Sequence, residues 1–495
     1  MAPSLEALSE ELLVRIISLT PRHALHAVAL TSRTLNRLAT PALYSNIDLE
    51  GSNGASGTKF LIPLTYHLLK NTSLAAMVQT FAMRDMFSSE DEGDLVPLCE
   101  GRDSNSRKGG PDDQMDVDSL LMKAVADVED AKEEEKLFKI VLEGSDEGLI
   151  IALLISKLPN LRRLQIVGDM MDAQERILHF IQRISRRDTP FDKKPVLTKL
   201  TDVLISGWDE KYPNPPDMIG AYMELPSIRR VHCYQLGNNE QDAVTESLGT
   251  LGIATSPVEE LELRGSQLYA ADLDKILKSC RNLKTFIYEV GHAWAWYTVR
   301  TSDIMDSMKA VEKTLENLVL DHSEYIGDAA EDIDHLSALS LAAFDKLRYL
   351  KISAMFLGGF KKEVKYDLGR TFPASLEELH VTYVGDQTYC PSWIPAALQD
   401  VIERKETVFP AMMKLTLQGA FLTNADRLDA IKALVQTARK KGVEIVILAE
   451  DGDTTDAWDR VHERGYGLHG EIEWSGYRSD MIPDLVVVDV EGRGW

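Results

Sequence analysis

The feature that most constrains the fold of this chain is a short apolar pattern that recurs along most of its length. Nine segments carry side chains in the order apolar-x-x-apolar-x-apolar, and they start 25 to 39 residues apart. They are Leu161-Leu164-Ile166, Leu200-Val203-Ile205, Ile228-Val231-Cys233, Val258-Leu261-Leu263, Leu283-Phe286-Tyr288, Leu315-Leu318-Leu320, Leu347-Leu350-Ile352, Leu376-Leu379-Val381 and Met412-Leu415-Leu417. Alternating apolar positions are typical of a β-strand with one buried face, and their return at this period indicates a repeat architecture.

The segments between these strands have the apolar period of helices. Three examples are Ile151-Leu154-Ile155-Leu158, Leu273-Ile276-Leu277-Cys280 and Ile431-Leu434-Val435-Ala438. One strand and one helix cannot bury their apolar sides alone, so such units are stable only when stacked. The sequence therefore predicts an α/β protein whose residues 148–448 form an irregular solenoid, with a curved parallel sheet inside and helices outside. We expect one further strand at Val443–Leu448, and a closing cap over 449–495 that includes the apolar segment 485–490.

The segment 5–49 has the pattern of three short helices. Ser9 is a good N-cap for the first helix, which stops at Thr20-Pro21; the second starts at Pro21, and the third runs from Ser32 to just before Pro41. So small a unit cannot bury all of its large aliphatic side chains, so we expect them to form a docking surface. The residues predicted for this surface are Leu8, Leu12, Leu13, Ile16, Ile17, Leu19, Leu25, Val28, Leu30 and Leu35.

Together, LSEELLVRIISL, ALHAVALTSRTLNRLA and PALYSNIDL resemble the F-box motif over its whole length. The strand–helix repeat resembles leucine-rich repeats, although Asp169, Ser266, Gly291 and Ser323 stand where that family often has asparagine. The resemblance implies that residues 5–49 bind a Skp-family adaptor and, through it, the cullin and RING subunits of an SCF-type ubiquitin ligase. The solenoid would present an unknown target protein for ubiquitin-dependent degradation. The alternative is a non-ligase scaffold in which the F-box-like helices only cap the solenoid.

An acidic insertion is predicted after the first helix and strand of the solenoid, which we expect within residues 58–83, at Phe60–Leu69 and Val78–Met83. Residues 84–147 hold 20 acidic and 8 basic side chains, which is half of the net charge of −24. Because Asp85–Asp118 lacks a hydrophobic period, we expect it to be disordered, and Ser119–Leu142 to be an exposed helix. Ser88 and Ser89 fit an acid-directed kinase, but a solvated insertion is the favoured interpretation.

Composition and motifs argue against several functions. The acidic charge and the lack of a Lys/Arg-rich face disfavour nucleic acid. No leader is apparent, and the longest apolar run, Leu149–Ile155, is too short to cross a membrane. The four dispersed cysteines favour a reducing compartment. We therefore expect the protein in the cytoplasm or the nucleus. No phosphate loop, nucleophile elbow or H-E-x-x-H motif occurs, so we expect no catalytic residue, metal or cofactor.

The predicted target surface follows from strand alternation, because residues between the buried positions point to the other face of the sheet. In three successive repeats these are Arg230, His232 and Tyr234, then Glu260, Glu262 and Arg264, then Thr285, Ile287 and Glu289. We expect them to be exposed, with Trp294 and Trp296 on the adjacent rim, and predict target binding by Arg230, His232, Tyr234, Glu262, Ile287, Glu289, Trp294 and Trp296. An incidental mix of surface residues, or core packing of the tryptophans, is the alternative.

Overall fold

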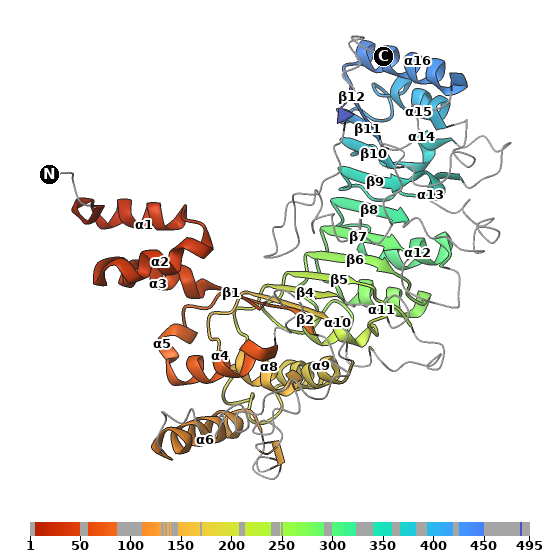
Figure 1. Ribbon diagram of the computed structural model, residues 1–495. Helices are drawn as coiled ribbons and strands as arrows, with labels where there is room; N and C mark the ends of the chain where they lie inside the picture. Colours follow the sequence, from red (N-terminus) through yellow and green to blue (C-terminus); the bar gives the residue numbers. More distant parts are fainter. Residues whose placement is uncertain are drawn as a thin grey trace. The chain divides into compact units, whose positions relative to one another are not determined.

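A computed structural model shows an α/β fold in which parallel strands alternate with helices (Figure 1). The structure describes residues 5–49, 58–86, 111–129, 133, 136–137, 139, 147–168, 171–206, 213–238, 248, 251–291, 299–322, 340–358, 367–382, 394–418, 425–449 and 486–487. The chain divides into two compact units. Unit 1 comprises Met1–Ile205 and Leu225–Ile228, and unit 2 comprises Ser206–Glu224 and Arg229–Trp495.

Unit 1 begins with three helices and continues into a parallel sheet. Its helices are α1 (Glu10–Ser18), α2 (Arg22–Thr31), α3 (Arg33–Ser45), α4 (Thr58–Lys70), α5 (Thr72–Ala75), α6 (Pro111–Ala126), α8 (Glu147–Ser156) and α9 (Met171–Arg186). Its strands, in the order in which they lie side by side, are β1 (Asn46–Leu49), β2 (Thr80–Met86), β3 (Arg163–Gly168) and β4 (Asp202–Ser206). The sequence pattern missed β1, which pairs in parallel with β2 directly after α3.

Unit 2 continues the alternation. Its strands are β5 (Arg230–Tyr234), β6 (Glu260–Ser266), β7 (Thr285–Val290), β8 (Asn317–His322), β9 (Tyr349–Ser353), β10 (Glu378–Thr382), β11 (Lys414–Gln418), β12 (Glu444–Ala449) and β13 (Val486–Val487). Its helices are α10 (Asp217–Met223), α11 (Ala270–Ser279), α12 (Thr301–Met308), α13 (Ala354–Gly358), α14 (Leu368–Thr371), α15 (Ile394–Glu403) and α16 (Ala425–Lys441). In Figure 1, α11, α12, α14 and α15 lie on one side of these strands.

The strand register confirms the repeat pattern. The second apolar position of each repeat pairs with its equivalent in the next, giving the row Val231, Leu261, Phe286, Leu318, Leu350, Leu379, Leu415 and Ile445. The side chains of all nine predicted segments are buried, and they form the core between sheet and helices. The strand at Val443–Leu448 is confirmed as β12, and β13 falls within 485–490 and pairs antiparallel to β12.

The absent asparagine of the repeat is partly replaced by Ser266. Its hydroxyl accepts a hydrogen bond from the Leu236 backbone N–H at 3.0 Å and donates one to the Arg264 carbonyl at 2.8 Å. Asn238 also satisfies a backbone group next to a strand end, because its amide oxygen accepts a hydrogen bond from the Tyr269 backbone N–H at 3.0 Å. Buried backbone groups at the strand ends are therefore satisfied by side chains that do not recur at one fixed position.

The three N-terminal helices form where they were predicted, with one correction. Ser32 caps α3 by accepting a hydrogen bond from the Leu35 N–H at 3.2 Å. The helix does not end before Pro41 but continues to Ser45. Proline removes one backbone hydrogen bond, yet continuing the helix packs Ala42 and Leu43 against the helical core, which offsets that loss.

The acidic insertion contains packed structure, so the predicted exposed helix and part of the predicted disorder are wrong. Residues 85–86 belong to β2, and α6 starts at Pro111; residues 87–110, with Ser88 and Ser89, lie outside the described residues. Leu121, Val125 and Val128 are buried. They follow the i, i+4, i+7 spacing of a helix face, which the surrounding acidic residues hid from composition-based reading.

Ion pairs fix the end of this insertion to unit 1. Asp127 accepts hydrogen bonds from Lys157 at 2.6 Å and from Lys194 at 2.7 Å, and Glu129 accepts one from Arg183 at 2.7 Å. Burial opposes ionisation of Asp127, but the two lysines outweigh it and lower the pKa of its carboxyl group. The insertion therefore contributes both apolar and ionic contacts to the fold.

Candidate functional site

The sheet face predicted to carry the target surface is largely buried in unit 2. His232, Tyr234, Glu262, Ile287 and Glu289 are all buried, so the expectation that they are exposed is wrong. Arg230 and Glu260 are half-buried, and Trp294 and Trp296 lie outside the described residues. Strand alternation correctly assigned these side chains to one face, but it could not show that the face is covered.

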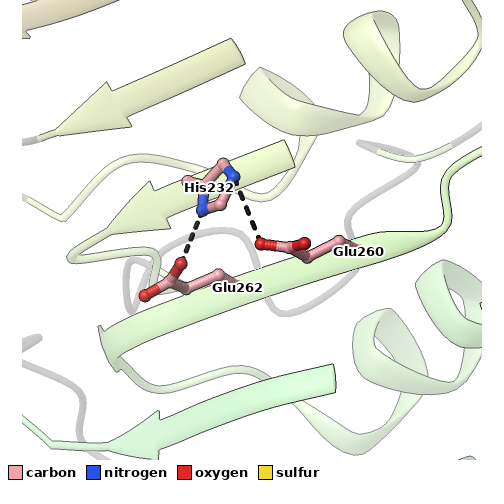
Figure 2. Close-up of side chains that lie close together, drawn as sticks. All are labelled: His232, Glu260 and Glu262. Carbon is pink, nitrogen blue, oxygen red and sulfur yellow. Dashed lines mark hydrogen bonds and ion pairs between the residues drawn. The ribbon is translucent and has the colours of Figure 1, made fainter. Parts of the chain in front are cut away.

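Charged side chains on this face form a buried charged cluster, which consists of His232, Glu260, Glu262, Arg264 and Glu289. His232 lies on β5 and its Nδ1 atom is 2.5 Å from Glu262 Oε2 on β6, while its Nε2 atom is 3.7 Å from Glu260 Oε1 on the same strand (Figure 2). Arg264 Nε donates a hydrogen bond to Glu262 Oε1, and Arg264 Nη1 lies 3.3 Å from Glu289 Oε2 on β7. Adjacent parallel strands bring these groups together because His232 and Glu262 pair in register.

The charges in the cluster support one another. Burial opposes ionisation of Glu262, but attraction to Arg264 and the hydrogen bond from His232 outweigh it and lower the pKa of Glu262 to about 2. Burial also disfavours the charged form of Arg264, yet the carboxylates of Glu262 and Glu289 raise its pKa above the usual value. Glu262 is therefore an ionised, hydrogen-bond-accepting group at neutral pH.

A second set of polar groups continues across the next strands of the same face. Lys351 Nζ on β9 lies 3.2 Å from Asp321 Oδ2 on β8, and Thr382 on β10 donates a hydrogen bond to Asp321 Oδ1 at 3.0 Å. His380 on β10 is half-buried there; desolvation and the nearby Lys351 lower its pKa to about 3. His232 and His380 therefore occupy opposite electrostatic environments, since His232 lies between carboxylates and His380 lies beside a lysine.

The buried charged cluster offers metal-binding atoms. His232, Glu260 and Glu262 each offer one donor atom, and these three atoms lie within 4.8 Å of one another. Among the described residues, this is the group of three that could hold a metal ion. An imidazole nitrogen with carboxylate oxygens suits several divalent transition metals. The sequence held a signal for this arrangement, since His232 and Glu262 occupy the same position of successive repeats, but only the in-register pairing shows that they touch.

The two cysteines of unit 2 that the structure describes are not reactive groups. Cys233 and Cys280 are buried free thiols. Burial raises the pKa of Cys280 to about 12 and raises that of Cys233 as well, so both thiols stay protonated at neutral pH. Cys99 and Cys390 lie outside the described residues.

The predicted adaptor-binding residues separate into two groups. Leu13, Ile17, Leu25 and Leu35 are buried in the core of the three helices together with Ala29 and Ala39, and Val28 packs against that core. Leu8, Leu12, Ile16, Leu19 and Leu30 are exposed. Only the second group presents side chains to a partner, so the first group supports the surface without forming it.

Comparison with known proteins assigns no family. No family model matches the chain, and no curated protein matches it. The function of the chain therefore has to be inferred from its residues and from the geometry of its two units.

Proposed function

We propose that this protein is the substrate-recognition subunit of an SCF-type ubiquitin ligase, and that helices α1 and α2 dock a Skp-family adaptor. The observation that supports this role is a stripe of exposed aliphatic side chains on a helical unit that already has a complete core. On α1 and its C-cap, Leu12, Ile16 and Leu19 are 53, 41 and 68% exposed and share one helix face; we call them the apolar stripe.

The apolar stripe is a separate feature from the helical core. Leu13 and Ile17, one position further along α1, are buried, because they lie about 100° around the helix from Leu12 and Ile16. Leu30 at the end of α2 adds a further aliphatic side chain that is 71% exposed. Large aliphatic groups left in water forgo roughly 1.5–3 kcal/mol of burial each, so a partner that covers them gains that free energy.

The alternative, a non-ligase scaffold whose helices only cap the sheet, explains a different part of the structure. Helix α3 leads directly into β1, and the Gln79 N–H donates a hydrogen bond to the Ser45 carbonyl at 2.8 Å. These contacts join the helices to the end of the sheet in unit 1. They leave the apolar stripe uncovered, and that uncovered stripe favours the adaptor-binding role.

In the proposed complex the adaptor joins the protein to cullin and RING subunits, which carry out ubiquitin transfer, and unit 2 binds the target protein. We propose a cytoplasmic or nuclear location for this assembly. Among the described residues, every helix is too short or too polar to span a lipid bilayer. Because His232, Tyr234, Glu262, Ile287 and Glu289 are buried, target contacts on this face would start from its accessible groups, Arg230 and Glu260.

The test is capture of a purified Skp-family adaptor by full-length protein carrying Ile16→Asp. A carboxylate placed in an apolar interface would be desolvated without a partner, so we expect adaptor binding to weaken at least about 100-fold. Val14→Asp is the matched control, because Val14 is an exposed aliphatic residue on the opposite side of the same helix. That variant should bind like the wild type. Failure of the wild-type protein to bind the adaptor, or equal binding by the Ile16→Asp variant, would favour the scaffold alternative.

A further inference from the structure

The geometry around His232 fixes which of its ring nitrogens carries a proton. Arg264 donates a hydrogen bond to Oε1 of the Glu262 carboxylate, and Oε2 of the same carboxylate lies 2.5 Å from Nδ1 of His232, so this geometry makes Nδ1 the donor and Glu262 the acceptor. In a neutral imidazole the other nitrogen, Nε2, then presents a lone pair. Glu262 is in turn held by Arg264, which bonds its other oxygen.

A second carboxylate lies near Nε2. Nε2 lies 3.7 Å from Glu260 Oε1, as the upper dashed line of Figure 2 shows. This separation is too long for a hydrogen bond. It suits two ligands of one metal ion, since donors about 2.0–2.1 Å from a tetrahedral zinc ion lie roughly 3.3–3.5 Å apart, and further apart as the angle between them opens.

The surroundings resemble the outer shell of a metal centre. A histidine that binds a metal through one nitrogen usually donates its other N–H to a carboxylate or carbonyl, which orients the ring and strengthens it as a ligand. Here Glu262 supplies that carboxylate, and Arg264 with Glu289 holds Glu262 in place. Glu260 lies at the edge of the cluster, because its side chain is 22% exposed, while its Oε1 atom, His232 and Glu262 are buried.

We propose that His232 Nε2 and the Glu260 carboxylate of this protein bind one divalent transition-metal ion of the zinc type, with Glu262 as the residue that orients the imidazole. One nitrogen and one carboxylate ligand leave coordination positions for water or for a further side chain. The role does not depend on adaptor binding, because all of these residues belong to unit 2 and the apolar stripe belongs to unit 1.

The experiment titrates Zn²⁺ into metal-stripped full-length protein by calorimetry, with Co²⁺ absorption as a second readout of nitrogen and oxygen ligands. The wild type should bind one ion, and bound metal should raise its melting temperature. His232→Asn and Glu260→Gln should each weaken binding by at least about 10-fold, the lower end of what loss of even an outer-shell partner costs. His380→Asn is the matched control, since His380 is a half-buried histidine at the equivalent register position but lies beside Lys351.

Two results would overturn the proposal. One is that the wild type binds no zinc, or that both ligand variants bind zinc as tightly as the wild type does. Unchanged binding in both variants would indicate adventitious sites elsewhere. The other is a nitrogen NMR spectrum in which both ring nitrogens of His232 are protonated at neutral pH and stay so when zinc is added, which would make a proton the cation between the two carboxylates. Glu260→Gln keeps the test decisive if His232→Asn fails to fold, because Glu260 is only half-buried.

Discussion

The residues of the buried charged cluster stabilise one another, because Arg264 and His232 both bond the Glu262 carboxylate from neighbouring positions on the sheet face. Alternation placed His232, Glu262 and Ile287 on the same face, and the register confirms that they pair across neighbouring strands. The error lay in treating that face as exposed. A buried ionised carboxylate is expected only where cations and donors surround it, and the sequence does not show that Arg264, two positions along β6, turns back onto Glu262.

His380 gives a pH-dependent prediction at this scale. Its pKa is lowered from 6.5 to about 3 in the folded protein, by burial first and by Lys351 second, with Asp321 acting in the opposite direction. Above pH 6.5 the ring is neutral in both the folded and the unfolded chain, so it has no effect on the pH dependence. As pH falls from 6.5 toward 3, the unfolded chain binds a proton that the folded chain does not, and the free energy of unfolding decreases.

The measurement is the free energy of unfolding at pH 7.5 and at pH 5 for wild type and for His380→Asn. Between pH 6.5 and about pH 3, this single histidine contributes up to about 1.4 kcal/mol per pH unit to the fall in the free energy of unfolding. The variant should therefore lose less stability than the wild type over the same pH step, whatever its stability at pH 7.5. Equal losses in the two proteins would show that His380 titrates normally.

At the scale of elements, the sequence predicted the strands far better than it predicted the insertion. The strands were found because each repeat carries three apolar residues that are all buried, so one pattern reports both the element and its burial. Helix α6 was misjudged because its few apolar residues lie among Asp and Glu, and composition outweighed spacing. Strand β1 was missed because four residues, Asn46–Leu49, are too short to show a period.

The insertion gives the prediction at this scale. Leu121 and Met122 are neighbours on α6, with 3 and 55% of their side chains exposed. Leu121→Ala should destabilise unit 1 by about 2–5 kcal/mol, because it leaves a cavity in a packed interface, whereas Met122→Ala should stay within about 0.5 kcal/mol of the wild type. Amide hydrogen exchange over α6 should accelerate only in the first variant. Equal exchange in both variants would mean that α6 is not docked.

At the scale of the whole molecule, the two proposed binding functions belong to different compact units. The apolar stripe lies in unit 1, while the buried charged cluster and the predicted target-binding residues lie in unit 2. The sequence indicated both roles but not this boundary, because the apolar repeat runs through both units without a break: Val203 and Val231 occupy equivalent positions on either side of it. A unit boundary depends on how densely residues contact one another across the chain, and a local pattern carries no such information.

The division can be tested by damaging each unit separately. Leu350 is fully buried on β9 in unit 2, so Leu350→Ala should reduce the stability of that unit by about 2–5 kcal/mol. Because neither the apolar stripe nor its supporting core is altered, adaptor affinity should remain within about 2-fold of the wild type at temperatures where unit 2 stays folded.

Ile16→Asp should have the converse effect, with adaptor binding lost and the melting of unit 2 unchanged, since Ile16 is exposed and contributes little to any core. Adaptor titration and calorimetric melting of the same three proteins give both readouts. If Leu350→Ala weakened adaptor binding as strongly as Ile16→Asp does, the two units would be energetically coupled and adaptor docking would depend on the fold of the repeat sheet.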